Sequence, residues 1–261
     1  MTDTAGFYDD LAGTYDRIFV DWEHSVQVQG RTLDTLLRGA LGNQGHRVLD
    51  CAAGIGTQLL GLARHGHCVA GADISSGALR RARLEARHLG VPAPLAVADM
   101  RRLPFADSSF DVVVCADNAI THLLDDGDLA AALGEMRRVL RPGGLVVLTL
   151  RDYDRLSAER PPLLPTHLSR TERGAATLTV PMCEWSPDGG RYLLRQVQVS
   201  EQPSGGWVTV ERRVRCRAYG RAEVRCAAEH AGLSGVRWVM PTEGYFYQPV
   251  LLATRPHGEA G

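Results

Sequence analysis

Between residues 47 and 150 the sequence alternates short apolar segments with longer amphipathic ones. The apolar segments are nearly continuous runs of Val, Leu and Ala, as expected for strands that helices cover on both faces. Strands that alternate with helices in this way predict a doubly wound, mostly parallel α/β sheet. We predict strands at 47–51, 68–73, 95–98, 110–116 and 145–150, helices at 58–65, 76–88 and 128–140, and a tight turn at 141–144.

The segments on either side of this alternation follow other patterns. Aromatic and apolar residues at helical spacing predict helices before it, and the first helix either packs on the core or covers a ligand as a lid. After residue 150 a loop-like stretch precedes period-2 segments separated by glycine-containing turns, which predict antiparallel hairpins. We predict helices at 7–22, 24–41 and 221–231, hairpin strands at 176–183, 191–200 and 207–217, and final strands at 236–240 and 248–253.

Composition argues against several classes of function for this chain of 261 residues. A net charge of -1 disfavours a nucleic-acid or membrane partner, and no stretch reaches the roughly 18–20 apolar residues of a membrane span. The first residues lack the features of a signal peptide, so we expect a cytoplasmic protein, with a homo-oligomer compatible with the sequence. The six cysteines form no C-x-x-C pair and the pair His65 and His67 has no further ligand near it in sequence, so we expect no metal.

Small or polar residues follow each strand of the predicted sheet. In an open parallel sheet, ligands bind at the carboxyl ends of the strands, so these residues are candidates for a binding site. They are Ala52, Gly54 and Gly56 after the first strand, Asp73 after the second, Asp99 and Met100 after the third, Asp117, Asn118 and His122 after the fourth, and Arg151 and Tyr153 after the fifth.

The turn Gly54-Ile-Gly56 lets backbone N–H groups and a helix N-terminus approach a ligand closely. Asp73, further along, has the place of a carboxylate that accepts hydrogen bonds from ribose hydroxyls. Asp99 is suited to accept from an adenine amino group, with Met100 against the ring. Leu59 replaces the third glycine of a dinucleotide fingerprint, which favours a nucleoside with an amino-acid tail over NAD.

Five segments together resemble class I S-adenosylmethionine-dependent methyltransferases, and the resemblance covers residues 46–150. They are Val48-Leu-Asp-Cys-Ala-Ala-Gly-Ile-Gly56, Ala72-Asp-Ile-Ser-Ser, Ala98-Asp-Met100, Phe110-Asp-Val-Val-Val and Leu140-Arg-Pro-Gly-Gly144. The resemblance implies S-adenosylmethionine as cofactor and S-adenosylhomocysteine as product. We expect the cofactor to be held by Tyr15, Asp50, Ala52, Gly54, Gly56, Asp73, Ile74, Asp99, Met100 and Ala116.

The resemblance also implies a Rossmann-like sheet of seven strands with an antiparallel β insertion after the fifth strand. We accordingly divide the chain into four parts. These are an N-terminal helical lid (1–45), a cofactor-binding core (46–154), the antiparallel insertion over the substrate site (155–219), and a C-terminal helix and strands that complete the core sheet (220–261).

Two further segments are similar to the glycine N-methyltransferase group, which includes bacterial glycine/sarcosine enzymes. They are Asp117-Asn-Ala-Ile-Thr-His-Leu123 and Leu150-Arg-Asp-Tyr-Asp154. This resemblance implies that Asn118 and Arg151 hold a substrate carboxylate, and that His122 and Tyr153 line the pocket. The glycine turn departs from the group's commoner Ala-Cys-Gly-Thr-Gly, and Arg31 is our candidate for the arginine that meets the cofactor carboxylate.

These observations predict methyl transfer to a small molecule, an amine bearing a carboxylate, by in-line displacement. His122, Asn118 and Tyr153 are the predicted catalytic residues. Two roles stay open: Arg151 binds a carboxylate in bidentate fashion or forms an ion pair with a neighbouring aspartate, and His122 is a general base, a polar wall or a structural residue. The alternative function is an O- or C-methyltransferase of secondary metabolism with a more apolar acceptor.

Overall fold

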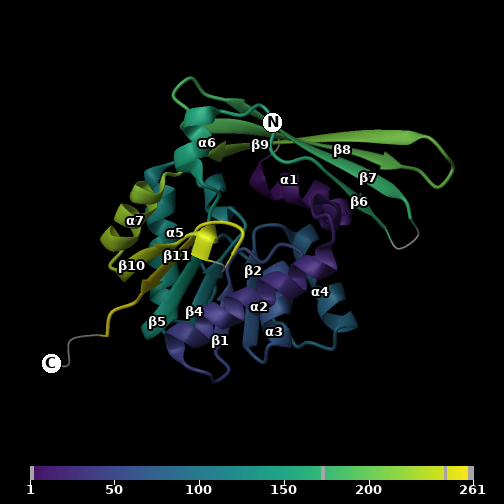
Figure 1. Ribbon diagram of the computed structural model, residues 1–261. Helices are drawn as coiled ribbons and strands as arrows, with labels where there is room; N and C mark the ends of the chain where they lie inside the picture. Colours follow the sequence, from purple (N-terminus) through teal and green to yellow (C-terminus); the bar gives the residue numbers. More distant parts are fainter. Residues whose placement is uncertain (1–2, 172–173, 244–245, 258–261) are drawn as a thin grey trace.

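The computed structural model describes residues 3–171, 174–243 and 246–257 and contains two β-sheets (Figure 1). The larger sheet has seven strands in the order β10-β11-β5-β4-β1-β2-β3. All its pairs are parallel except β11 with β5 and β10 with β11, which confirms the predicted Rossmann-like sheet. Its strands are β1 (Arg47–Asp50), β2 (Cys68–Asp73), β3 (Leu95–Val97), β4 (Phe110–Cys115), β5 (Leu140–Thr149), β10 (Ser234–Val239) and β11 (Val250–Thr254).

Helices cover both faces of this sheet because successive side chains of its apolar strands point to opposite sides. Val48 and Val112 belong to the cluster that includes apolar residues of α2 and α3. Leu49 and Val113 belong to the cluster that includes residues of α5 and α7. The helices around the sheet are α2 (Trp22–Leu41), α3 (Thr57–Arg64), α4 (Ser76–His88), α5 (Asp126–Val139) and α7 (Arg221–His230).

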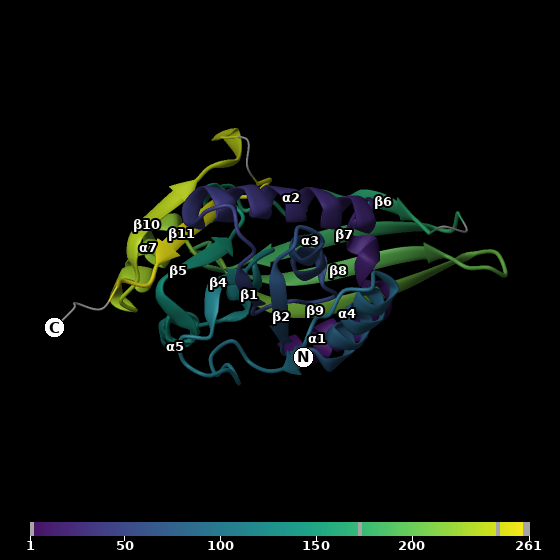
Figure 2. The ribbon, with the colours of Figure 1, turned by 90° about the horizontal axis from the view of Figure 1, so that it is seen from below.

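The second sheet is antiparallel, has the order β6-β7-β8-β9, and lies over one edge of the core (Figures 1 and 2). Helix α1 (Thr4–Leu11) and the 3-10 segment η1 (Ala12–Ile18) lie between the two sheets. Thr14 of η1 donates to Gln198 of the second sheet at 2.7 Å. Among the described residues, no helix has the length and apolarity to cross a membrane. The strands are β6 (His167–Arg170), β7 (Ala176–Trp185), β8 (Arg191–Glu201) and β9 (Trp207–Arg217).

The structure differs from the predicted elements in three places. The helix predicted at 7–22 is α1 followed by η1, and α2 begins separately after its N-cap residue Asp21. The loop predicted at 151–174 contains the short helix α6 (Tyr153–Glu159) and strand β6. The tight turn predicted at 141–144 is part of β5.

The segment 141–144 stays in the sheet because the end of the chain pairs with it. Gly143 N donates to Arg255 O at 2.8 Å, and Arg255 N donates to Gly144 O at 2.9 Å. The parallel register with β4 shifts between Phe110 and Val112, so the Pro-Gly-Gly sequence forms an irregularity within β5 rather than a turn before it.

Helices α2 and α3 cross at a glycine on each helix. A Cβ atom at Gly30 would lie 2.5 Å from Gly61 Cα, and one at Gly61 would lie 2.5 Å from Val26 O. Since these neighbours are backbone atoms, they cannot yield by a side-chain rotation. The crossing therefore requires glycine, and it holds α2 against the helix that begins at the glycine turn.

We predict that Gly30→Ala lowers the free energy of unfolding by about 1–3 kcal/mol, because overpacking forces the two helices apart. Gly39→Ala in the same helix is the matched control, since no atom lies within 4 Å of the added Cβ. Alanine there should stabilise the helix by roughly 0.5–1 kcal/mol. Urea unfolding of both variants measures the difference, and equal effects would contradict the close crossing.

Candidate active site

The glycine turn joins β1 to α3 through two residues in the left-handed region of backbone space. Gly54 has φ 51° and Gly56, the N-cap of α3, has φ 95°. A Cβ on Gly54 would lie 3.5 Å from the Tyr15 ring, whereas one on Gly56 would lie 3.1 Å from Leu60. Gly54 therefore faces a cavity and, above it, residues 4–18 (α1 and η1), which we call the N-terminal segment. Gly56 provides the backbone conformation from which helix α3 begins.

Asp73, at the end of β2, holds the glycine turn in place. Its carboxylate accepts from Gly54 N at 2.8 Å through Oδ2 and from Ser75 N at 2.8 Å through Oδ1. Burial raises the pKa of this carboxyl, while the two backbone hydrogen bonds oppose that rise. Each carboxylate oxygen has a further lone pair for a ligand hydroxyl.

Asp99, after β3, has a cationic partner within the chain. The Arg101 guanidinium donates to both of its carboxylate oxygens and also to Asp128 at 2.6 Å. These hydrogen bonds lower the pKa of Asp99, so the group is a carboxylate at neutral pH. An adenine amino group would therefore share Asp99 with Arg101.

The first cavity lies between the glycine turn and the N-terminal segment and has a volume of about 120 Å³. Eight of the ten predicted cofactor residues line it, and Asp50 and Gly56 do not. Those that line it are Tyr15, Ala52, Gly54, Asp73, Ile74, Asp99, Met100 and Ala116.

Asp50 lies beneath the turn, with 1% of its surface exposed. Its Oδ1 accepts from Ala52 N at 3.3 Å, while Oδ2 has no hydrogen-bond partner in the described part of the chain. Burial raises the pKa of this carboxyl to about 7. Arg31, our candidate for the cofactor carboxylate, is exposed on α2 and lines neither of the two cavities.

A second, larger cavity of about 770 Å³ lies between the end of the core sheet and the second sheet. The predicted substrate residues Asn118, His122 and Arg151 line it. Tyr153 does not; its hydroxyl is within 2.6 Å of the hydroxyl of Tyr192, which does line the cavity. Tyr153 thus reaches this cavity through Tyr192 rather than directly.

The two cavities adjoin, because five residues line both of them. The N-terminal segment and the residue after it contribute the aromatic part of this shared wall, and the chain after β4 contributes its polar part. The shared residues are Tyr8, Tyr15, Phe19, Asp117 and His122. A group bound in one cavity and a group bound in the other can meet only here.

Asp117 and Asn118 turn the chain sharply after β4, with φ values of 54° and 68°. Asn118 Oδ1 accepts from Arg151 N at 2.6 Å, so the predicted substrate ligand joins the ends of β4 and β5. Asp117 Oδ2 accepts from Gln58 at 2.7 Å, and Oδ1 accepts from the hydroxyl of Tyr247. Burial raises the pKa of Asp117 against the effect of these hydrogen bonds.

Arg151 has no acidic side chain within 4.0 Å among the described residues. The two neighbouring aspartates, which we considered as its partners, pair with another arginine. Arg221 binds Asp152 at 2.6 Å and Asp154 at 2.8 Å. The Arg151 guanidinium on the wall of the second cavity is therefore available to an anionic group of a ligand.

His122 is held between the N-terminal segment and the second sheet. Its Nε2 lies 2.8 Å from the hydroxyl of Tyr8, and its Nδ1 lies 3.9 Å from Cys216 Sγ. Burial lowers the pKa of the imidazole to about 4, so it is neutral near pH 7. A base this weak is poorly matched to an ammonium group, which favours a polar wall over a general base.

Three further residues shape this site. Asp117 is a polar residue after the fourth predicted strand, but the sequence analysis assigned it no role. Tyr192 and Tyr247 come from β8 and from the segment before β11, so only the folded chain brings them to the ends of β4 and β5.

Comparison with known proteins places the chain among methyltransferases. A family model described as "Methyltransferase domain" matches residues 48–144. A glycine/sarcosine N-methyltransferase of Parasynechococcus marenigrum is 33% identical over 151 residues, which are 58% of this chain and 52% of that protein. A demethylmenaquinone methyltransferase of Mycobacterium sp. (strain KMS) is 33% identical over 215 residues, which are 78% of this chain and 75% of that protein.

A solved structure has the same fold. The S-adenosylmethionine-dependent methyltransferase from Clostridium acetobutylicum superimposes with a TM-score of 0.75 at 17% identity, over 95% of this chain and 99% of that one. The chain spans about half the length of the first curated relative, 52%, and three quarters of the mycobacterial one. The match to the mycobacterial protein extends over most of both chains and shows that this chain belongs to the same methyltransferase family.

We predict that His122→Gln makes the free energy of unfolding less dependent on pH between 6.5 and about 4. In this window the unfolded chain binds a proton at His122 and the folded chain does not, so the wild-type protein loses stability as pH falls. Urea unfolding at several pH values measures the slope, with His88→Gln on the exposed end of α4 as control. Parallel curves for wild type and His122→Gln would contradict a buried, neutral imidazole.

Proposed function

We propose, from the premise that this chain belongs to the class I S-adenosylmethionine-dependent methyltransferases, that it methylates the amine of a small molecule that also carries an anionic group. The observation that carries the proposal is Arg151, whose guanidinium lines the larger cavity and has no acidic partner among the described residues. A guanidinium is suited to bidentate binding of a carboxylate.

The residues of the first cavity fit S-adenosylmethionine. We assign its ribose hydroxyls to Asp73, its adenine to the side chains of Ile74, Asp99 and Met100, and its amino-acid part to the glycine turn at Gly54. A Cβ on Gly54 would take up space toward Tyr15, which agrees with a turn that a ligand approaches closely. The bound cofactor supplies a methyl group that its sulfonium sulfur has already activated.

We propose that the N-terminal segment moves to admit the cofactor. The first cavity has a volume of about 120 Å³, below the roughly 300–1,000 Å³ of ordinary ligand pockets. Tyr8 and Tyr15, stacked with ring centroids 5.6 Å apart, close it from the N-terminal side. We assign residues 4–18 the role of a lid that opens for exchange and excludes water when closed.

The reaction takes place at the wall that the cavities share. Arg151 and the surrounding polar groups orient the acceptor so that its nitrogen points to the methyl carbon, and alignment supplies most of the rate enhancement. An amine reacts through its lone pair, so an ammonium must first lose a proton. Asp117 is the carboxylate of the shared wall and takes this proton. Burial raises the pKa of Asp117 and makes it a stronger base, whereas burial lowers the pKa of His122 and makes it a weaker one. S-adenosylmethionine bound in the first cavity would supply its methyl group to this nitrogen by in-line displacement.

A second candidate function is methylation of carbon or oxygen in a more apolar acceptor. It is favoured by the apolar lining of the second cavity on the side of Leu11, Leu156 and Leu164, and by the demethylmenaquinone methyltransferase relative. A methyl-transfer assay with amino acids, other amines, phenols and quinols separates the two functions. Turnover confined to phenols or quinols would exclude the N-methylation proposed above.

We predict that Asp73→Ala weakens binding of S-adenosylmethionine by at least about tenfold, because hydrogen bonds to a charged group contribute roughly 1.5–3 kcal/mol. Calorimetric titration measures the dissociation constant. Asp107→Ala, at a carboxylate whose side chain is 73% exposed, is the control and should bind as the wild type does. Unchanged affinity in Asp73→Ala would remove Asp73 from the cofactor site.

We predict that Arg151→Gln raises KM for an amine that bears a carboxylate by about 10- to 150-fold, the loss expected for charge-assisted hydrogen bonds. The dissociation constant of S-adenosylmethionine should change by less than about twofold, since Arg151 does not line the first cavity. Steady-state kinetics and calorimetry measure the two quantities, with Arg83→Gln on the exposed side of α4 as control. Equal effects on acceptor and cofactor would contradict the proposed role.

A further inference from the structure

Part of the face of the second sheet that points toward the core is polar. An antiparallel sheet with one covered face ordinarily places apolar residues there, as this sheet does at Tyr192, Val214 and Cys216. Further along the strands, buried positions carry hydroxyl and amide side chains instead, each with no more than 7% of its surface exposed. They are Ser169, Thr177, Thr179, Gln196 and Gln198.

Most of these groups are satisfied by the N-terminal segment. Thr179 Oγ1 donates to the carbonyl of Arg17 at 2.9 Å, and Gln198 Nε2 donates to the carbonyl of Thr14 at 3.1 Å. The polarity of this part of the sheet is thus explained by η1, whose backbone carbonyls it binds. It does not require a ligand.

Gln196 and His167 differ from their neighbours. Both line the second cavity, and within the described residues neither side chain has a hydrogen-bond partner. Gln196 is 7% exposed, and the Nε2 atom of His167 is buried. Burying a polar atom without a partner costs about 1–3 kcal/mol, and this applies to His167 Nε2. The amide of Gln196 opens on the same cavity, so the two side chains together are suited to a polar occupant.

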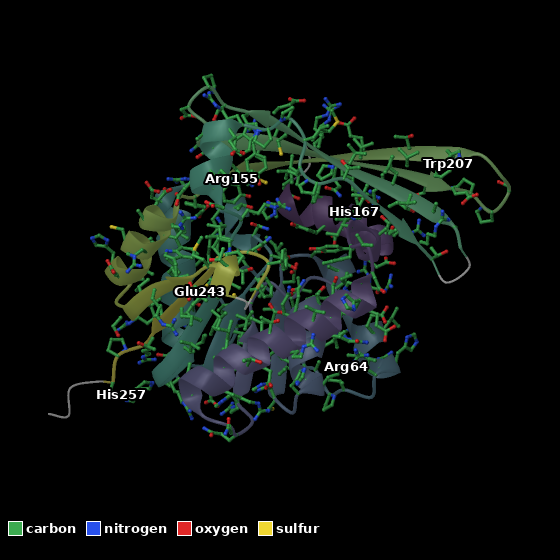
Figure 3. All side chains as sticks on the ribbon, in the orientation of Figure 1. Arg64, Arg155, His167, Trp207, Glu243 and His257 are labelled. Carbon is green, nitrogen blue, oxygen red and sulfur yellow. The ribbon has the colours of Figure 1, made fainter. Side chains whose placement is uncertain are left out.

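These groups lie far from Arg151 along the cavity. Tyr192, Leu194 and Gln196 occupy alternate positions of β8 and line the same wall. Gln196 lies four positions after Tyr192, the neighbour of Tyr153, which corresponds to about 14 Å at roughly 3.4 Å per residue. Figure 3 labels His167 on β6 and Arg155 on α6, which also line the cavity and lie apart along the second sheet.

The chemistry at this end of the cavity is uncharged. An imidazole and a primary amide each offer a donor and an acceptor, which a hydroxyl group matches on both counts. Arg212 faces Gln196 across the β8–β9 pair, but it donates to Gln198 and does not line the cavity. A hydroxylated group therefore fits this end better than a phosphate or an ammonium.

We propose, on the basis of the function assigned above, that Gln196 and His167 form a subsite for a hydroxylated part of the methyl acceptor. The acceptor then has two parts: an amine and anion between Asp117 and Arg151, and a polyhydroxyl part along β8. Glycine or sarcosine would occupy only the first part. Because the two ends lie about 14 Å apart along β8, the substrate class is a hydroxylated amino acid of about disaccharide length.

The test compares glycine with a disaccharide in which glucosaminuronic acid, an amino sugar acid with a carboxylate, carries a second sugar that extends toward Gln196 and His167. Their binding is measured by calorimetry in the presence of S-adenosylhomocysteine, and their methylation by release of S-adenosylhomocysteine from S-adenosylmethionine. We expect wild-type kcat/KM for the disaccharide to exceed that for glycine by at least tenfold. Gln196→Leu and His167→Leu should each reduce this ratio about fivefold or more, with the glycine value unchanged.

Gln27→Leu, on the exposed side of α2, and His88→Leu, on the exposed end of α4, are the matched controls and should retain the wild-type ratio. Thermal unfolding verifies that each variant folds. Failure of the disaccharide to bind, or equal losses for both acceptors in Gln196→Leu, would overturn the subsite. Absence of any methyl transfer together with absence of S-adenosylmethionine binding would instead overturn the proposed function.

Discussion

Parallel strand pairing is the constraint on which this site depends. Because β1 pairs in parallel with β2 and β4, and β4 with β5, the chain leaves these strands at one edge of the sheet. The hydrogen bond from Gly54 N to Asp73 then fixes the first two strand ends to each other, and that from Arg151 N to Asn118 fixes the last two. One pair of ends forms the floor of the smaller cavity, and the other forms the wall of the larger one. The geometry of methyl transfer thus follows from the connection of neighbouring strands.

The N-terminal segment and the second sheet convert this open edge into enclosed space. Asp9 of α1 accepts from Ser75 Oγ at 2.7 Å and from Gly77 N at 2.6 Å, which attaches the segment to the start of α4. On its other side η1 binds the polar face of the second sheet through its backbone carbonyls. Between these hydrogen bonds, Phe7 and Leu11 pack into the hydrophobic cluster that also contains Tyr192 of the second sheet. The N-terminal segment therefore joins the core to the second sheet by apolar packing as well as by hydrogen bonds.

The core could be predicted from the sequence because its signals are local. Strands buried on both faces are continuous apolar runs, and the bounds of β2 and α4 agree with the predicted 68–73 and 76–88. Helix α6 and strand β6 were missed because each is short and lies in a proline-containing segment, where composition resembles that of a loop. The segment 141–144 was assigned as a turn because its strand pairing depends on Arg255, more than 100 residues away.

The candidate site likewise contains residues that local sequence signals indicated and residues that only the folded chain brings together. Residues that follow a strand, such as Asp73 and Arg151, were found because their position alone brings them to the edge of the sheet. Asn118 was found, but its oxygen binds the backbone of Arg151, a contact that spacing does not reveal. Gln196 comes from a strand that only tertiary packing brings to the cavity, so no local pattern indicated it.

The central claim is that cofactor and acceptor meet at the wall formed by Asp117, His122 and the N-terminal aromatic residues. A crystal structure of the protein with S-adenosylhomocysteine tests it most directly. We predict that the ribose hydroxyls bind Asp73 and that the thioether sulfur faces the shared wall, with Arg151 on the far side of it. A cofactor bound elsewhere, or a sulfur directed away from Asp117 and the larger cavity, would contradict this account.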